Sequence, residues 1–231
     1  MANNLGEKAK RMLQEFVPEI DERIAKYFDE EIMALRKKKD FGFNGRQKKL
    51  NREILEHAKE YILRPTKRLR GSFVYYGCKL GMKVPDWHAC VGVELVHAGI
   101  LMHDDVQDRD EYRRGGLTTH KFFEQKMTSL HLGEAMAMNL GVTLMCLGFE
   151  LIGDKSVFRA IANTAYGQAY DLSLEAGGKW TEEDVIALHQ AKTAIYTYEN
   201  PLFIGAHLAG LPKEAFEVLH DYAMDGGVAF Q

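Results

Sequence analysis

The stretch that decides the fold reads ELVHAGILMHDDVQDRDEYRRGG, residues 94–116. Its aspartates follow twelve mostly apolar residues, 91–102, which only Glu94 and His97 interrupt. Such a run predicts a central, buried helix. Ionised carboxylates at the end of a buried helix are costly unless a cation compensates them. We therefore expect a cation to bind where this helix ends.

The spacing of the carboxylates suits a cation site. Asp104 and Asp108 are four residues apart, so their side chains project from one face of a helix and can share a hard cation through oxygen ligands. His97 lies seven residues before Asp104, two turns away on nearly the same face. It is either part of this site or a histidine satisfied within the core. For Glu94, a hydrogen bond at the edge of the core is explanation enough.

Two arginines follow the carboxylates in a glycine-containing loop. Arg113 and Arg114 directly precede Gly115 and Gly116. Guanidinium groups bind phosphate oxygens through paired hydrogen bonds, so the two arginines suit recognition of a diphosphate. The alternative is that they form ion pairs with the neighbouring carboxylates.

The rest of the chain also has a helical pattern. Its five prolines are scattered, and apolar residues recur at the helical period. Breaks are expected at 41–45, at Pro65 and at several glycine-containing segments, and Thr181 has the character of a helix N-cap. Signals for β-strands are weak. We predict an all-α fold with helices at 5–38, 46–63, 67–80, 87–106, 129–152, 155–176, 181–208 and 213–231.

Composition narrows the class of protein. A chain of 231 residues with 46% hydrophobic content can bury one core, and a net charge of −3 argues against a nucleic-acid partner. No apolar run of the roughly 20 residues that span a bilayer is present, and the N-terminus lacks the apolar segment of a secretory signal. Cys78, Cys90 and Cys146 match no zinc or disulfide spacing and are expected to be buried thiols. We expect a cytoplasmic protein with no transmembrane segment.

The order of these motifs resembles the polyprenyl synthetase family, the trans-type isoprenyl diphosphate synthases. His103-Asp104-Asp105-x-x-Asp108, followed by the two arginines, is similar to the first aspartate-rich motif of that family. Each short match is weak alone, but together, in the family order, they are specific. The other matches are Lys67-Arg68-Leu69-Arg70, Gln168-x-x-Asp171, Lys192-Thr193 with Pro201 and Gly205 beyond it, and Gly226-Gly227-x-x-Phe230-Gln231.

The resemblance implies a homodimer of helical bundles, each around a central cavity with the motifs at its mouth. It implies Mg²⁺ as the cofactor, and isopentenyl diphosphate and an allylic diphosphate as substrates. Asp104 and Asp108 would ligate Mg²⁺ with support from Asp105, and Lys192 would join these three in catalysis. Isopentenyl diphosphate would be held by Lys67, Arg70, His97 and Arg114. The allylic diphosphate would be held by Arg113, Lys192, Thr193 and Gln231, with Gln168 and Asp171 lining its site.

The sequence departs from the family pattern in three places. Pro65-Thr66 stand where the family usually has two glycines, and Val142 stands where it often has aspartate. The sequence also ends at Gln231, and the family's second aspartate-rich motif should begin within the next few residues. We therefore expect residues 1–231 to be a single prenyl synthase domain without the C-terminal helices and that motif. A polypeptide that truly ended there would ionise its substrate poorly.

The implied reaction is a head-to-tail condensation that lengthens a prenyl diphosphate. One helical turn is about 5.4 Å, close to the length of one isoprene unit, so side chains one and two turns before Asp104 are candidate floors of the product site. Ile100 and Val96 occupy those turns, beside Gly99, and none is aromatic. We expect geranylgeranyl diphosphate or a longer product, unless blocking groups on a facing helix set the limit.

Three other interpretations compete with this one. A terpene cyclase or a squalene-synthase-like enzyme would share the helical fold, but it would not need Lys67, Arg70 and His97 for a second diphosphate. A non-catalytic partner subunit, or an inactive fragment of a prenyl synthase, would share the motifs without the activity. A helical interaction protein would bind neither Mg²⁺ nor a bisphosphonate.

Overall fold

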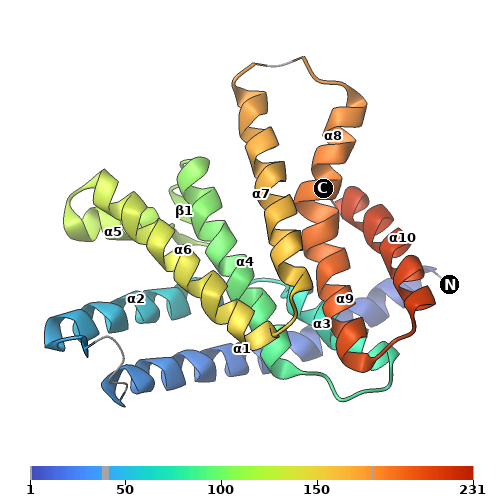
Figure 1. Ribbon diagram of the computed structural model, residues 1–231, viewed down its shortest axis with the longest axis horizontal. Helices are drawn as coiled ribbons and strands as arrows, with labels where there is room; N and C mark the ends of the chain where they lie inside the picture. The colour runs from blue at the N-terminus through green and yellow to red at the C-terminus, as the bar shows by residue number, and fades with distance from the viewer. Residues whose placement is uncertain (1, 38–41, 178, 231) are drawn as a thin grey trace. The chain divides into compact units, whose positions relative to one another are not determined.

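The computed structural model describes residues 2–37, 42–177 and 179–230, and these are almost entirely helical (Figure 1). The prediction of an all-α fold is confirmed. A two-stranded antiparallel hairpin interrupts the helices, with Tyr112 opposite Leu117 and Arg113 opposite Gly116. The elements are α1 Ala2–Lys37, α2 Gly45–Leu63, α3 Leu69–Leu80, α4 Trp87–Gln107, β1 Tyr112–Arg113, β2 Gly116–Leu117, α5 Thr119–Met127, α6 Leu130–Ile152, α7 Ser156–Glu175, α8 Glu182–His189, the π-helix η2 Gln190–Glu199, α9 Asn200–Ala209 and α10 Lys213–Phe230.

Two compact units make up the chain. Unit 1 comprises Met1–Arg68 and Glu94–Leu151, and unit 2 comprises Leu69–Val93 and Ile152–Gln231. Each unit has a core of its own and is described by itself. The single-domain expectation stays a prediction.

The core of unit 1 forms where α1 packs along α2. Ile20, Ile24 and Phe28 recur every four residues on α1 and are fully buried, as expected for the apolar stripe of an amphipathic helix. The start of α2 is fixed by a capping box, in which the Asn44 side chain accepts hydrogen bonds from backbone N–H groups and the Gln47 side chain accepts one from the Asn44 N–H. At the other end of α2, Arg64 bonds carbonyl oxygens of the hairpin.

Helices α4 and α6 of unit 1 approach each other closely at two glycines. A Cβ atom on Gly99 would lie 2.5 Å from the Gly141 carbonyl oxygen, and one on Gly141 would lie 2.5 Å from the His103 ring. The His103 ring also bonds the Met138 carbonyl oxygen at 2.9 Å. Larger residues at either glycine would push the two helices apart.

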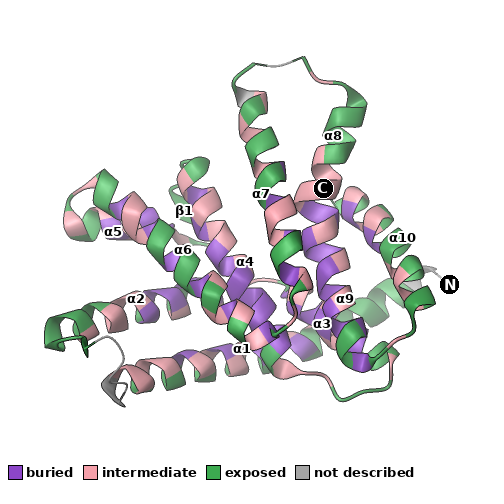
Figure 2. Cartoon of the chain, viewed as in Figure 1, coloured by how far each residue is buried: buried purple, intermediate pink, exposed green. Residues whose placement is uncertain are grey.

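Unit 2 is built on the contact of α3 with α9, and buried residues gather along both helices (Figure 2). A Cβ atom on Gly77 of α3 would lie 2.8 Å from the Leu202 carbonyl oxygen, and one on Gly205 of α9 would lie 2.3 Å from the Val74 carbonyl oxygen. Helices α7 and α10 pack against η2. The π-helix is therefore held between its neighbours.

The sequence pattern was wrong about three local features. The hairpin and α5 were not predicted, because β1 and β2 have two residues each and α5 has nine, too few to show a period. The expected helix 181–208 is instead α8, η2 and α9 in succession. Its predicted N-cap is confirmed, since the Thr181 side chain accepts from the Asp184 N–H.

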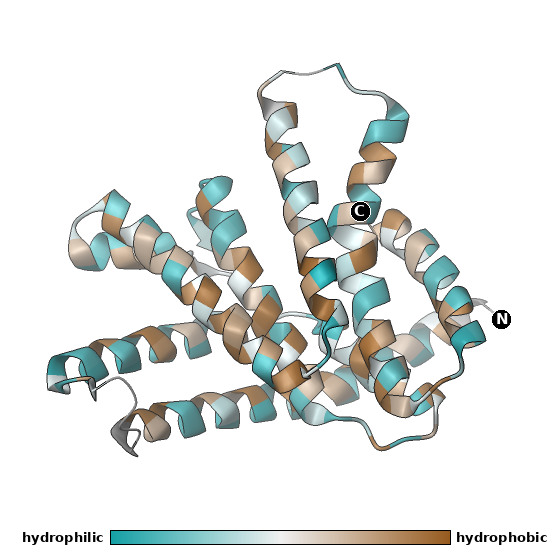
Figure 3. Cartoon of the chain, viewed as in Figure 1, coloured by the Kyte–Doolittle hydropathy of each residue, from teal (hydrophilic) through white to brown (hydrophobic). Residues whose placement is uncertain are grey.

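Helix α6 carries many hydrophobic residues (Figure 3). Several of them are exposed, namely Leu130, Leu132, Met138 and Val142. Cys78 and Cys90 are buried as predicted, but Cys146 on α6 is exposed, so that prediction was wrong. Among the described residues, α6 is the helix long and apolar enough to cross a membrane by length and composition. This is weak evidence, because the core helix of a soluble protein passes the same test. The absence of a transmembrane segment stays a prediction.

Candidate functional site

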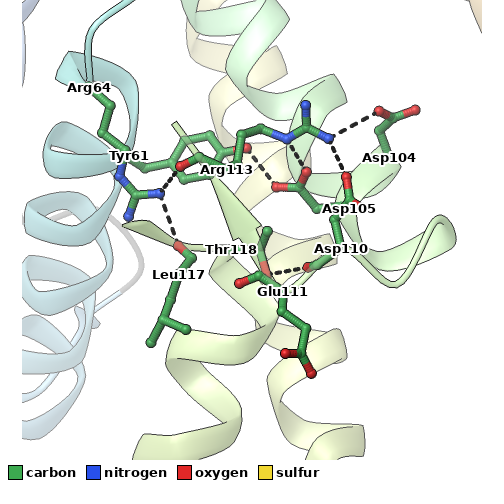
Figure 4. A network of polar contacts seen from close by, with 9 residues as sticks. All are labelled: Tyr61, Arg64, Asp104, Asp105, Asp110, Glu111, Arg113, Leu117 and Thr118. Carbon is green, nitrogen blue, oxygen red and sulfur yellow. Dashed lines mark hydrogen bonds and ion pairs between the residues drawn. The ribbon is translucent and has the colours of Figure 1, made fainter. Parts of the chain in front are cut away.

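A fully buried carboxylate, Asp105, anchors the candidate site of unit 1 (Figure 4). The Tyr61 hydroxyl donates a hydrogen bond to its Oδ2 at 2.7 Å, and Arg113 Nε donates to its Oδ1. Burial raises the pKa of Asp105 above its ordinary value, while the charge of Arg113 and the two hydrogen bonds act in the opposite direction. Asp105 therefore ties α4 to α2 and to the hairpin.

Arg113 contacts two further carboxylates. Its Nη2 lies 2.9 Å from Asp110 and 3.6 Å from Asp104. Burial alone would lower the pKa of Arg113, but the neighbouring Asp105 outweighs burial and the pKa is raised. Ion pairing with the carboxylates was the alternative interpretation of the sequence, and this is how Arg113 is placed. Its role toward an allylic diphosphate stays a prediction.

Asp104 and Asp108 lie where α4 ends. The Asp108 N–H donates to the Asp104 carbonyl oxygen at 2.8 Å, so helical bonding continues through Asp108. Asp108 is exposed and Asp104 is partly exposed. The described residues contain no group of three or more His, Cys, Asp or Glu side chains that could hold a metal. Two carboxylates nevertheless fit Mg²⁺, which usually takes one or two from a protein and completes its shell with water and phosphate oxygens.

The hairpin presents Arg114 in a tight two-residue turn. Arg114 and Gly115 have φ values of 52° and 81°, as a type I′ turn requires. Glycine suits such a φ, but for arginine the left-handed region costs about 1 kcal/mol. Strain of this kind persists where the surrounding structure enforces it, often at functional sites.

Arg64, at the end of α2, enforces the hairpin conformation. Its Nη1 donates to the carbonyl oxygens of Arg113 and Leu117, each at 3.0 Å (Figure 4). Its Nε and Nη2 donate to the Glu60 carboxylate. A Cβ atom on Gly116 would lie 2.4 Å from Arg64 Cζ. Gly116 is therefore needed so that this guanidinium can lie against the strand.

The Arg114 guanidinium makes no hydrogen bond, and no ion pair within 4 Å, with any residue in the described part of the chain. Burial lowers its pKa, and the nearby positive charge of Arg68 lowers it further, while Glu94 opposes both. A half-buried cation beside a second cation favours an anion as its partner.

The basic motif separates into a structural and an exposed residue within unit 1. Arg68 is buried, with its Nε 2.7 Å from Asp21 and its Nη1 3.4 Å from Glu94. This supports the structural explanation of Glu94. Lys67 is exposed, and His97 is half-buried on α4.

In unit 2 the structure brings together two of the predicted allylic-site residues. Lys192 Nζ on η2 lies 2.5 Å from Asp171 Oδ2 on α7. Thr193 is buried beside Lys192, and Gln168 is half-buried on α7. A Cβ atom on Gly167 would lie 3.2 Å from the Lys192 nitrogen, so α7 and η2 are in close contact there. Gln231 lies outside the described residues.

Arg70 also belongs to unit 2, where it contacts the π-helix. Its Nη2 donates to Thr197 Oγ1 at 2.6 Å, and its Cζ lies 4.6 Å from the centre of the Tyr196 ring. The sequence pattern gave no sign of these two partners. Nor did it single out Tyr61 and Arg64, because a tyrosine and an arginine near a helix end have many uses and only the fold shows which side chain they meet.

A hollow of about 430 Å³ lies beside the hairpin and α5, apart from the aspartates. The charged side chains in its wall are two acids and one base, since Lys121 Nζ lies 3.5 Å from Glu111 and 3.0 Å from Glu124. The small excess of negative charge does not favour a diphosphate there.

Comparison with known proteins shows the family. The polyprenyl synthetase pattern matches residues 52–231. The chain belongs to the polyprenyl synthetase family. It is 32% identical over 157 residues to the geranylgeranyl diphosphate synthase of Methanosarcina mazei, covering 62% of this chain and 45% of that one. It is 31% identical over 192 residues to a mitochondrial geranylgeranyl pyrophosphate synthase of Arabidopsis thaliana, covering 75% of this chain and 56% of that one. The chain thus spans about half the length of the curated relatives it matches.

Solved structures show the same fold. A geranylgeranyl pyrophosphate synthase of Corynebacterium glutamicum, complexed with isoprenyl diphosphate and magnesium, matches with a TM-score of 0.82 at 22% identity, over 95% of this chain and 66% of that one. A farnesyl/geranylfarnesyl diphosphate synthase of Zymomonas mobilis matches with a TM-score of 0.72 at 25% identity, over 100% of this chain and 79% of that one. The isoprenoid-synthase-type fold predicted from the sequence is therefore confirmed.

Proposed function

We propose that the protein containing this chain condenses isopentenyl diphosphate with an allylic diphosphate, head to tail, in a reaction that depends on Mg²⁺. The observation that carries the proposal is the carboxylate pair at the end of α4, which the buried Asp105 anchors. The family match and relatives named as geranylgeranyl and farnesyl diphosphate synthases support it.

Charge at the end of α4 favours a divalent cation. Residues 104–114 contain five acidic and three basic side chains, so an excess of negative charge collects there. Asp104 and Asp108 would hold Mg²⁺. When bound, Mg²⁺ supplies positive charge to the departing diphosphate of the allylic substrate.

The chain's own cations act on the two diphosphates. Lys192, with Thr193 beside it and Arg113 from the hairpin, would stabilise the negative charge that grows as the allylic carbon–oxygen bond breaks. Lys67, Arg70, His97 and Arg114 would hold isopentenyl diphosphate so that its double bond attacks the allylic cation. Loss of a proton then completes the longer product. Gln168 and Asp171 would line the allylic site, and Asp171 would orient Lys192.

Incorporation of labelled isopentenyl diphosphate into prenyl product, with geranyl or farnesyl diphosphate and Mg²⁺, tests this proposal. Asp104→Ala should lower the rate about 10²-fold or more, since an electrostatic contributor of this kind is worth that much. Glu111→Gln removes a nearby exposed acid that pairs with Lys121, and it should leave the rate unchanged. Full activity of Asp104→Ala would reject the proposal, and an inactive unsubstituted protein would favour the partner-subunit interpretation.

The length of the product depends on what lies one and two turns before Asp104. Val96 is buried and Ile100 is half-buried. A Cβ atom on Gly99 would lie 2.9 Å from Met145 Cγ of α6, so Met145 fills the space that a side chain at 99 would need. We propose geranylgeranyl diphosphate or a longer product. Exclusive formation of farnesyl diphosphate would contradict this.

The exposed face of α6 supports a homodimer. Met138, Val142 and Cys146 are spaced four residues apart on one side of the helix, and all three are exposed. Burial of this apolar stripe against the same stripe of a second copy would be more favourable than its exposure to water. Light scattering should give the mass of a dimer for the protein, and Val142→Asp should shift it toward the monomer. A cytoplasmic location is part of the same proposal.

A further inference from the structure

The π-helix η2 contains the predicted site residues Lys192 and Thr193, and it also contacts several other parts of unit 2. Its hydrogen bonds join residues five apart, as where the Asn200 N–H donates to the Ile195 carbonyl oxygen. Such helices are rare and occur mostly as short bulges at functional sites, whereas η2 runs for ten residues. An irregular backbone of this length needs support from its neighbours.

Glycines on two neighbouring helices supply that support. Gly167 of α7 lies against the Lys192 backbone, where an added Cβ atom would come within 3.2 Å of the nitrogen. On α10, a Cβ atom on Gly227 would lie 2.3 Å from Ala194 Cα. The backbone on both sides of Thr193 is thus fixed by close packing.

The later part of η2 holds Arg70 of α3. Thr197 accepts one hydrogen bond from the guanidinium, and the ring of Tyr196 lies under it. Both residues are buried. Arg70 Nε is also buried, yet it forms no hydrogen bond with any described residue. A buried donor without an acceptor is unfavourable, and a charged donor attracts an anionic acceptor most strongly.

We propose that Thr197 and Tyr196 are positioning residues for isopentenyl diphosphate, because they hold the Arg70 guanidinium with its Nε toward a diphosphate oxygen. The inference rests on the proposed function and adds to it residues that no family motif of this chain includes. Thr197 lies five residues after Lys192, one π-helical turn away. One segment of backbone therefore sets both the Lys192 side chain and the anchor of Arg70.

Thr197→Val tests the proposal, since valine keeps the shape of threonine and removes the hydroxyl acceptor. Titration calorimetry of the protein that contains this chain, with Mg²⁺ present, would measure its affinity for isopentenyl diphosphate and its affinity for geranyl diphosphate separately. We expect Thr197→Val to weaken the affinity for isopentenyl diphosphate about tenfold, because a hydrogen bond to a charged group is lost. The affinity for geranyl diphosphate should change less than about twofold. Thr197→Ser should restore the affinity. Tyr196→Leu, which removes the ring, should weaken the same ligand.

Each outcome bears on the proposal. Equal losses for both ligands would mean that Thr197 only maintains η2, and unchanged isopentenyl diphosphate affinity would mean that Arg70 needs no anchor. Either result overturns the inference while the proposed function stands. If the unsubstituted protein, with the circular dichroism of a helical protein, bound neither ligand, the proposed function itself would fail. Should Thr197→Val not fold, Tyr196→Leu and Thr197→Ser decide the question by the same comparison.

Discussion

The end of α4 in unit 1 and the π-helix in unit 2 both position charged side chains, but by different means. In unit 1 a carboxylate without solvent contact, Asp105, is bonded by Tyr61 and Arg113. In unit 2 the Lys192–Asp171 pair is partly exposed, and its place is set by an irregular backbone packed against glycines. Charge holds the first region, and backbone packing holds the second. Removal of a charged side chain should therefore lower the free energy of unfolding more in the first region than in the second. Added volume should disturb the packing of the second region.

The largest effect should come from Asp105→Ala. It leaves the buried Tyr61 hydroxyl without its acceptor and the partly buried Arg113 guanidinium without Asp105, although Asp110 remains. Loss of one partner of a buried ion pair costs about 3 to 5 kcal/mol. Urea unfolding followed by circular dichroism measures the loss of free energy of unfolding. Asp105→Asn keeps the shape and should lose less. A cost below about 1 kcal/mol for Asp105→Ala would show that charge does not hold this region.

Acid should weaken unit 1 through His57, whose ring bonds Thr119 Oγ1 at 3.1 Å and stacks on Phe122. Burial is the main cause that lowers the pKa of His57 to about 4, with Arg64 and Lys126 adding to it and Glu60 opposing it. Because the folded form binds a proton less readily than the unfolded form, the contribution of His57 is complete above pH ~6.5 and is lost as the pH falls toward 4.

The free energy of unfolding lost through His57 should reach about 3 kcal/mol near pH 4. Urea unfolding of the unsubstituted chain and of His57→Gln, measured across this pH range, gives the free energy of unfolding as a function of pH. The slopes of the two plots should differ by the amount that corresponds to uptake of about one proton on unfolding. Parallel curves would contradict the prediction.

Gly227→Ala should disturb unit 2 by volume alone. The added methyl group would meet Ala194 Cα, a backbone atom that cannot move aside, and overpacking of this kind costs about 1 to 3 kcal/mol. Gly226→Ala is the matched control, because its Cβ atom would meet only the Tyr198 ring at 3.3 Å. Both changes gain helix propensity equally, so the difference between their free energies of unfolding reports the packing of η2. Equal values would remove the distinction between the two regions.

Asp171→Ala should have the smallest effect on stability. The Lys192–Asp171 pair is partly exposed, and such pairs contribute less than about 1 kcal/mol. The same urea titration measures it, with Asp105→Ala as the reference. If Asp171→Ala cost as much as Asp105→Ala, charge would hold both regions alike.

The sequence predicted those features of the structure that follow from the hydrophobic period of a helix or from a family motif. The helix that carries Asp104 was predicted from spacing, and the sites of Lys192 and Asp171 were assigned together from family order. The partners of Asp105 and Arg70 did not, because Tyr61 and Thr197 lie 44 and 127 residues away from them along the chain. The π-helix was also missed, since a hydrophobic pattern at helical spacing does not tell i→i+4 from i→i+5 bonding over ten residues.

The hairpin turn has a consequence for the cost of binding. Arg114 already has its left-handed backbone, and Arg64 bonds the carbonyl oxygens on both strands. An anion that meets Arg114 therefore has to order only the end of one side chain, and the conformational entropy of the loop is lost during folding instead of during association. Affinity at this position should accordingly depend on Arg64, a residue that need never touch the ligand.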